Sequence, residues 1–142
     1  MRQSDIPPET IAAYRETGYR FGRGADLVSL RIDTRSEALA RLYASSGHRC
    51  GVFITACNPL GQRQSREENE AAQACLAAEL KALAIPAIEG EGVDPAGAWP
   101  AEKSFFALGV ALDAARELGL RHHQNAIVWA GADAVPKLIL LR

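Results

Sequence analysis

The run CGVFIT at residues 50–55 is the feature that most restricts how this chain can fold. It is nearly continuous in apolar residues, carries β-branched side chains, and has the length of one strand. Such a run is typical of a strand that is covered on both faces. The run therefore predicts a central strand of a layered protein, with further strands beside it and helices packed on the sheet.

Helix signals lie before and after this strand. Pro7-Pro8-Glu9 predicts a short helix that ends at Gly18, because proline is tolerated in the first turn of a helix. Two pairs have capping-box spacing, Thr34 with Glu37 and Ser65 with Glu68. The first pair predicts a helix that ends at Gly47, and the second pair predicts the longest helix. A fourth helix is expected over residues 111–118, closed at Gly119-Leu120 by a Schellman motif.

Strand-like runs account for most of the remaining chain. YRFG and DLVSLRI, separated by Arg23-Gly24-Ala25, predict an opening β-hairpin. AIPAIEG and SFFALGV predict two further strands, whereas residues 90–99 (GEGVDPAGAW) are punctuated by glycine and proline and predict an irregular loop. NAIVWA and KLILL predict two closing strands. The expected fold is therefore α/β, with α+β as the alternative: a mixed sheet with helices packed on it.

Composition limits the class of protein. A length of 142 residues with 48% hydrophobic and 23% charged residues predicts one globular domain over residues 1–142. The formal net charge is −1 and the charges are dispersed, so nucleic acid is not an expected partner. No run is long and apolar enough for a membrane span, and the first residues lack the apolar core of an export signal. Three cysteines without a C-x-x-C pair favour the cytoplasm over a disulfide framework or a zinc cluster.

The turn after the central strand carries an unusual number of polar residues. FITACNPLGQRQSREEN breaks at Asn58-Pro59 and restarts as a helix near Ser65. Loops at strand ends often meet a ligand, and the helix start together with Arg63 or Arg66 suits an anion. The alternative is that Asn58 forms an Asx-turn onto its own backbone and that the arginines are solvated.

Three other groups of reactive residues are weaker candidates. Cys57 with His122 or His123 suggests a nucleophile and a base, but a lone cysteine is more often a small apolar residue. The two histidines with Asp94 or Glu102 match no metal-ligand spacing, so no metal site is predicted. The acidic stretch from Glu89 to Asp94 lacks the context of a calcium loop, and we expect it to be a flexible acidic loop.

A second polar set lies at the entry to two later strands. Glu102 and Ser104 precede one buried run, and Gln124 and Asn125 precede another. Such groups either satisfy loop backbone atoms or form a ring suited to a polar small molecule. Trp99 and Trp129 are further candidates for stacking on a ligand ring, with packing as the alternative.

These stretches, TACNP, Asn69, GEGVDPAGAWPAEKSFFALGV and HQNAIVW, resemble in order the pattern of a bacterial family, domain-of-unknown-function family 3293. The resemblance extends from about Ile11 to Leu138 and implies no reaction or cofactor. The family pattern has an aromatic residue at the position of Cys57, so the resemblance implies that the thiol is not a shared nucleophile. It also draws attention to Tyr14 and Tyr19 in the first segment.

The sequence thus predicts a pocket for a polar small molecule, with phosphate- or nucleotide-containing ligands among the alternatives. Asn58 and Asn69 are expected on one wall and Glu102, Ser104, Gln124 and Asn125 on the other, with Thr55 and Arg63 beside them. Glu102 is the candidate acid or base if the protein is an enzyme, and the cofactor is unknown. The alternative is an interaction module or homodimer that pairs through the C-terminal KLILLR strand.

Overall fold

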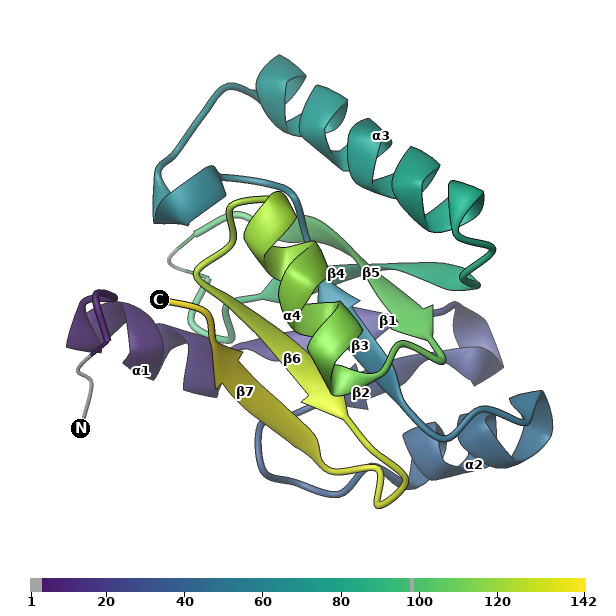
Figure 1. Ribbon diagram of the computed structural model, residues 1–142. Helices are drawn as coiled ribbons and strands as arrows, with labels where there is room; N and C mark the ends of the chain where they lie inside the picture. Colours follow the sequence, from purple (N-terminus) through teal and green to yellow (C-terminus); the bar gives the residue numbers. More distant parts are fainter. Residues whose placement is uncertain (1–3, 98) are drawn as a thin grey trace.

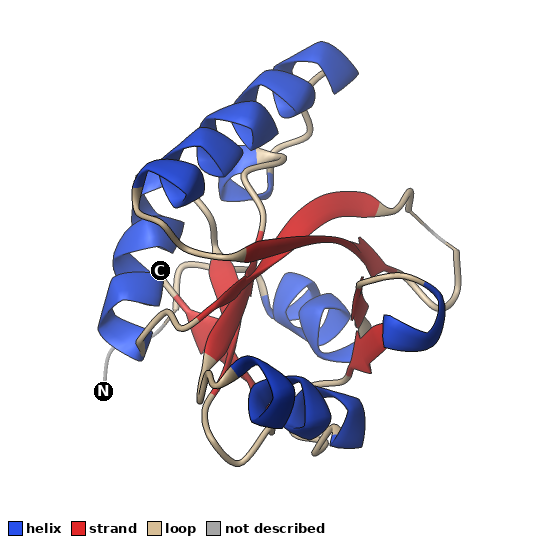
Figure 2. Ribbon diagram, turned by 90° about the vertical axis from the view of Figure 1, so that its right-hand side faces the viewer, coloured by secondary structure: helices blue, strands red, loops and turns tan. Residues whose placement is uncertain are grey.

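The computed structural model describes residues 4–97 and 99–142, and its centre is one curled sheet (Figures 1 and 2). Seven strands lie in the spatial order β2-β1-β4-β5-β3-β6-β7. They are β1 (Gly18–Phe21), β2 (Val28–Leu30), β3 (Gly51–Ile54), β4 (Ala87–Val93), β5 (Glu102–Leu108), β6 (Ala126–Ala130) and β7 (Pro136–Leu140). The predicted central strand is β3, which is buried along its whole length and lies between β5 and β6.

Helices cover both faces of the sheet. They are α1 (Pro8–Glu16), α2 (Glu37–Ser46), α3 (Arg66–Ala82) and α4 (Leu112–Arg121), with short 3-10 turns η1 (Gly24–Asp26) and η2 (Pro59–Gly61). Figure 2 shows α3 and α4 on one side of the sheet and α1 and α2 on the other. Two apolar clusters fill these layers, one under α2 through Leu39 and Tyr43, and one under α3 and α4 through Leu76, Leu80 and Leu118. The predicted fold class, opening hairpin and two closing strands are confirmed.

The expected mixture of parallel and antiparallel pairs is wrong, because every pair of neighbouring strands is antiparallel. The helix α3 connects β3 to β4, but β5 lies between these two strands, and α4 connects β5 to β6 with β3 between them. This is the split βαβ arrangement of ferredoxin-like folds. Each helix crossover leads to a parallel strand two places away, so a sequence that alternates strands and helices still produces an antiparallel sheet.

Residues 90–93 are strand and not the predicted irregular loop, because β4 continues to Val93. A side chain at Gly90 would place its Cβ 2.3 Å from the main-chain oxygen of Arg20 and 2.8 Å from Cβ of Phe21. Glycine is therefore required here by the close approach of β1. The expected flexible acidic loop is also wrong for this part, since Glu91 lies on the strand and pairs with Arg20 at 3.1 Å.

Two helix ends differ from the prediction. The N-cap of α2 is Ser36, whose side chain accepts a hydrogen bond from the Leu39 N–H, and not Thr34. The Schellman motif of α4 occurs four residues later than expected, with His123 in the left-handed conformation at φ 55°. Its two hydrogen bonds run from the Gln124 N–H to the Gly119 oxygen and from the His123 N–H to the Leu120 oxygen. Gly119 instead allows close packing, because a Cβ there would lie 2.5 Å from the Leu141 side chain.

The other predicted ends are confirmed. Gly47 closes α2 in the left-handed conformation, and the Ser65 and Glu68 capping box opens α3, the longest helix of the described chain. Among the described residues, no helix combines the length and the apolar character that a membrane span requires.

Candidate functional site

A cavity of about 280 Å³ lies between α1 and the sheet, and we call it the α1 cavity. Its polar lining comes from α1, from the turn after β3, and from the starts of β5 and β6. Its apolar lining includes Phe53, Ile127, Val128 and Leu138 from the sheet. Segments that are far apart in the sequence therefore enclose one hollow.

Seven of the eight residues that the sequence singles out line the α1 cavity, and one does not. The seven are Thr55, Asn58, Arg63, Glu102, Ser104, Gln124 and Asn125. Asn69 lies behind Asn58 and lines a neighbouring hollow, which shares Asn58, Arg63 and Glu102 with the α1 cavity. Asn69 thus does not form a wall of the α1 cavity.

Residues 58–64, which we call the Asn58 corner, have a backbone that needs side-chain support. Asn58 and Leu60 both have positive φ, 46° and 57°, which is unfavourable for leucine and tolerated by asparagine. The side-chain oxygen of Asn69 accepts hydrogen bonds from the Asn58 N–H and the Gln64 side-chain amide, each at 2.8 Å. The side-chain oxygen of Asn58 accepts from the Asn69 amide at 3.0 Å and from the Gln64 N–H at 3.2 Å.

This network explains the polar residues around the turn. Asn58 does not form the expected Asx-turn, since its oxygen reaches six residues along the chain to Gln64. Two asparagines and a glutamine fix a corner whose backbone would otherwise be strained. The one donor that remains on Asn58, its side-chain amide, points to Glu102 and donates to its Oε2 at 2.9 Å.

Glu102 opens β5 and is the acidic residue that lines the α1 cavity. Among the residues that the structure describes, Asn58 is the one donor to its carboxylate, and no cationic side chain forms an ion pair with it. Burial raises the pKa of Glu102, and the hydrogen bond from Asn58 opposes part of that shift. A carboxyl group of this kind is suited to proton transfer or to pairing with a ligand.

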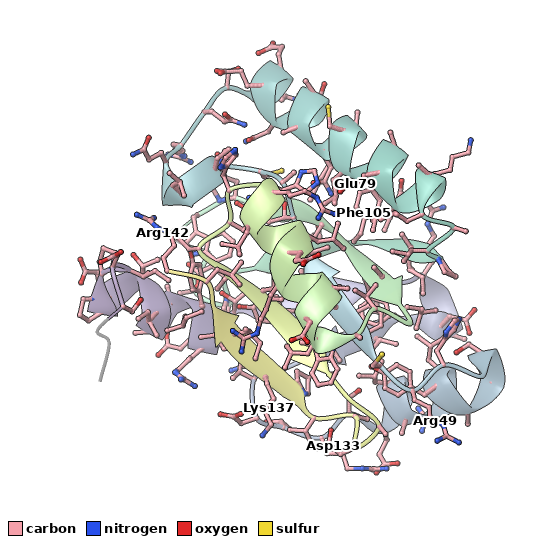
Figure 3. The ribbon with its side chains drawn as sticks, in the orientation of Figure 1. Arg49, Glu79, Phe105, Asp133, Lys137 and Arg142 are labelled. Carbon is pink, nitrogen blue, oxygen red and sulfur yellow. The ribbon has the colours of Figure 1, made fainter. Side chains whose placement is uncertain are left out.

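Asn125, at the entry to β6, joins three other groups. Its amide donates to the Tyr14 hydroxyl at 3.1 Å, and its oxygen accepts from Arg142 at 2.7 Å (Figure 3 labels Arg142). The Tyr19 hydroxyl donates to the main-chain oxygen of Tyr14 at 2.6 Å. Burial is the main cause that raises the pKa of the Tyr14 hydroxyl, so Tyr14 is a neutral phenol. Within the described chain, no acceptor is found for the Tyr14 proton, which leaves it available to a ligand.

Thr55, Ser104 and Gln124 use their side chains mainly to bind main-chain oxygens. Thr55 donates to Lys103 at 2.6 Å, and Ser104 donates to Glu102 at 3.1 Å. Gln124 is buried, and its amide donates to Cys57 at 3.2 Å and to His122 at 3.1 Å. These three side chains hold the cavity wall in place. This is the structural alternative given above, in which polar residues at strand entries satisfy backbone atoms of loops.

The other sequence candidates gain little from the structure. Burial raises the pKa of the Cys57 thiol, which donates to the Lys103 oxygen at 3.6 Å, and none of the described histidines lines the cavity beside it. His122 contacts Glu79 at 3.1 Å, and His123 is exposed. The described residues contain no group of three His, Cys, Asp or Glu side chains placed to hold a metal ion.

The start of α3 offers few free groups to an anion. The capping box occupies the N–H groups of Ser65 and Glu68, and Arg66 pairs with Glu70 at 3.0 Å. Arg63 is exposed and is the cationic side chain that lines both hollows.

Sequence reasoning missed the contribution of α1 to the site. Thr10, Ala13 and Tyr14 line the α1 cavity from that helix, and Thr17 lines it from the C-cap. Only Tyr14 had a signal, its place in the family-like pattern. Polar and small residues on a short helix give no indication of which strand the helix covers.

A family model described as "Protein of unknown function (DUF3293)" matches residues 54–127. No curated protein and no solved structure matches the chain. The matched segment lies within the range of the resemblance, and it contains all eight predicted site residues but not α1.

Proposed function

Because the chain belongs to the DUF3293 family, whose description assigns no activity, we propose a function from the α1 cavity itself: the protein binds a small molecule of mixed polarity there. The ligand fits between the polar groups of Asn58, Glu102 and Asn125 and an apolar floor formed by Phe53 and Val128. Ligand sites have this composition, mostly apolar with a few convergent polar groups.

One observation carries the proposal: polar groups from four separate segments converge on one hollow, and two of them keep hydrogen-bonding capacity. Glu102 has one donor to its carboxylate, and Tyr14 has a proton without an acceptor in the described chain. Thr55, Ser104 and Gln124, in contrast, are used by the fold.

The volume of the α1 cavity limits the size of the ligand. Small-molecule sites have volumes of roughly 300 to 1,000 Å³, and the α1 cavity of about 280 Å³ lies at the lower end. A molecule of one or two rings fits, whereas an intact nucleotide would extend over the rim toward Arg63. If the protein also transforms its ligand, Glu102 is the acid or base, because it is the acidic residue that lines the cavity and burial raises its pKa.

The test is a thermal-shift screen of sugars, amino acids, amines, nucleotides and metals on three proteins. Gly92→Val adds a side chain to the cavity wall, because Gly92 lines the cavity and a Cβ there meets its nearest neighbour, Thr17, at an ordinary 3.6 Å. Gly18→Val is the matched control, since Gly18 lies on the adjoining strand, has space beyond 3.8 Å and does not line the cavity.

A compound that stabilises the wild type and Gly18→Val but not Gly92→Val supports the proposal. Compounds that stabilise all three proteins equally bind elsewhere and contradict it.

A second candidate is an interaction module that pairs through β7, which is an edge strand of the sheet. The Leu141 N–H donates to the Asn125 oxygen next to β6. Because backbone N–H groups point to alternate sides along a strand, the N–H of the preceding residue, Leu140, points away from β6 to the open edge of the sheet. Leu140→Pro therefore blocks an added strand without removing a bond to β6. A wild-type dimer in light scattering that becomes a monomer in Leu140→Pro favours this candidate, and a wild-type monomer excludes it.

The proposal also places the protein in the cytoplasm. Cys50, Cys57 and Cys75 are free thiols, which suits a reducing compartment. Fractionation of the source cells with an antibody tests this placement.

A further inference from the structure

The Glu102 carboxylate lines the α1 cavity and forms no ion pair within the described part of the chain. Each ion pair among the described residues involves other acidic groups, and the one donor to Glu102 is the neutral amide of Asn58. An acidic group removed from water is costly unless it is paired or protonated. Among the described residues, no arginine or lysine forms an ion pair with this carboxylate, so a cationic group of a ligand would be its counter-ion.

Aromatic rings line the same cavity. They belong to Tyr14, Tyr19, Phe53 and Trp99. The Tyr19 and Phe53 rings meet edge to face, with their centroids 5.2 Å apart and an interplanar angle of 70°. Ring faces attract cations within about 6 Å of the ring centroid, and the attraction grows when water is excluded.

We propose that the α1 cavity selects a ligand that carries a positively charged amine, with Glu102 as its counter-ion and the aromatic rings around it. This inference rests on the proposed function and names the ligand class of the same site. The apolar floor takes the hydrocarbon part of the ligand, and the Tyr14 and Asn125 pair lies within the same lining.

Neutral and anionic ligands fit the charges less well. An anion bound in the cavity would be repelled by Glu102 whenever this carboxyl group is ionised, because the two charges would lie close together. Arg63 also lines the cavity, but it is exposed, and its charge is screened by solvent. A neutral ligand would leave the Glu102 charge without an opposite charge.

The proposal predicts the direction of the pH dependence. Tyr14 from α1, Tyr19 from β1 and Cys57 from the turn after β3 are the titratable groups that act on or face Glu102. Burial raises the pKa of all three, so they are uncharged at neutral pH, and the cationic side chains nearby are Arg63, Lys103 and Arg142. Of Glu102 and these three groups, only Glu102 changes charge below the range in which thiols and phenols titrate, so the affinity for an amine rises with pH as Glu102 loses its proton.

The experiment compares three probes of one shape, benzylammonium, benzyl alcohol and benzoate. Binding of each is measured by NMR titration on the wild-type protein and on Glu102→Gln at acidic and neutral pH. Glutamine still accepts the hydrogen bond from Asn58, so the corner is retained, and the benzyl alcohol titration reports whether the variant cavity is intact. We expect benzylammonium to bind the wild type roughly tenfold to a hundredfold more tightly than benzyl alcohol at neutral pH.

Loss of that preference in Glu102→Gln, with benzyl alcohol binding unchanged, supports the inference. Equal or tighter binding of benzyl alcohol or benzoate to the wild type overturns it, as does a preference for benzylammonium that persists in the variant or the absence of benzylammonium binding. The proposed function fails separately, when no compound of the thermal-shift screen distinguishes Gly92→Val from Gly18→Val.

Discussion

Replacing Asn69 by alanine tests how the Asn58 corner is held. The substitution removes three hydrogen bonds, two accepted by the Asn69 oxygen at 2.8 Å and one donated by its amide at 3.0 Å. Each contributes about 0.5 to 1.5 kcal/mol net, and water replaces part of the bond to the Gln64 side chain. The Asn58 N–H loses its partner, which adds to the cost. We expect a total loss of about 2 to 3 kcal/mol in the free energy of unfolding.

The assay is urea unfolding at neutral pH, with thermal unfolding as a second measurement. The expected loss corresponds to a fall in Tm of about 7 to 10 °C for a chain of this size. Gln64→Ala is the matched control, because it removes one bond to Asn69 and keeps the main-chain bond from Gln64 to Asn58. The control is expected to lose less than about 1 kcal/mol. Equal losses in the two variants would refute the role given to Asn69.

Three further predictions follow from the helix caps, the glycines of β4 and the buried acid. Ser36→Ala should cost about 1 kcal/mol of unfolding free energy and Thr34→Ala close to none, because the Ser36 side chain caps α2; the reverse order in urea unfolding would contradict the assignment. Gly90→Ala should cost about 1 to 3 kcal/mol, because its Cβ would lie 2.3 Å from a main-chain oxygen, whereas Gly92→Ala should change stability by less than about 1 kcal/mol; similar losses would refute the close approach of β1. Since burial raises the pKa of Glu102, the folded state keeps this proton at pH values where the unfolded chain has lost it. The stability that Glu102 provides is therefore complete below the pKa of the unfolded chain and declines as the pH rises through the pKa of the folded protein. The unfolding free energy of Glu102→Gln should therefore increase relative to that of the wild type as the pH rises from acidic to neutral. A difference between the two proteins that does not change with pH would contradict this prediction.

Local signals predicted most of the elements correctly. The continuous apolar run identified β3 as a central strand, and the spacing of Ser65 and Glu68 located the start of α3. Both signals depend on neighbours within a few residues. Thr34 failed for the same reason, since Ser36 is an equally good cap and the choice depends on where the backbone turns into the helix, which places the Ser36 N–H against the distant Ala134 oxygen.

Long-range contacts explain what the sequence did not reveal. Gly90 and Gly92 indicate a turn by composition, but both lie in β4. The backbone of β1 lies so close to Gly90 that a larger residue would not fit there. The antiparallel sheet follows from the insertion of β5 between β3 and β4, which no local pattern encodes. The position of α1 over the cavity depends on tertiary packing as well, so the contact of Tyr14 with Asn125 could not be predicted from the sequence.

The candidate site was predicted in part because it uses polar residues next to apolar strands. Asn58, Glu102 and Asn125 lie at strand ends, where a polar residue is conspicuous in the sequence. The sequence did not predict which of the polar residues face the ligand cavity and which only support the backbone. Asn69 and Gln124 belong to the scaffold because of the bonds that they make, and those bonds depend on the three-dimensional arrangement.

The central claim is that the Asn58 corner, Glu102 and Asn125 face one ligand cavity. Its most direct test is an NMR titration of the ¹⁵N-labelled protein with the best compound of the screen, following the side-chain amides of Asn58 and Asn125 and the main-chain amide of Gly92. We predict that the three resonances shift together along one saturation curve while the Gly18 amide stays in place. Resonances that saturate at different concentrations, or shifts confined to residues outside the cavity, would contradict the claim.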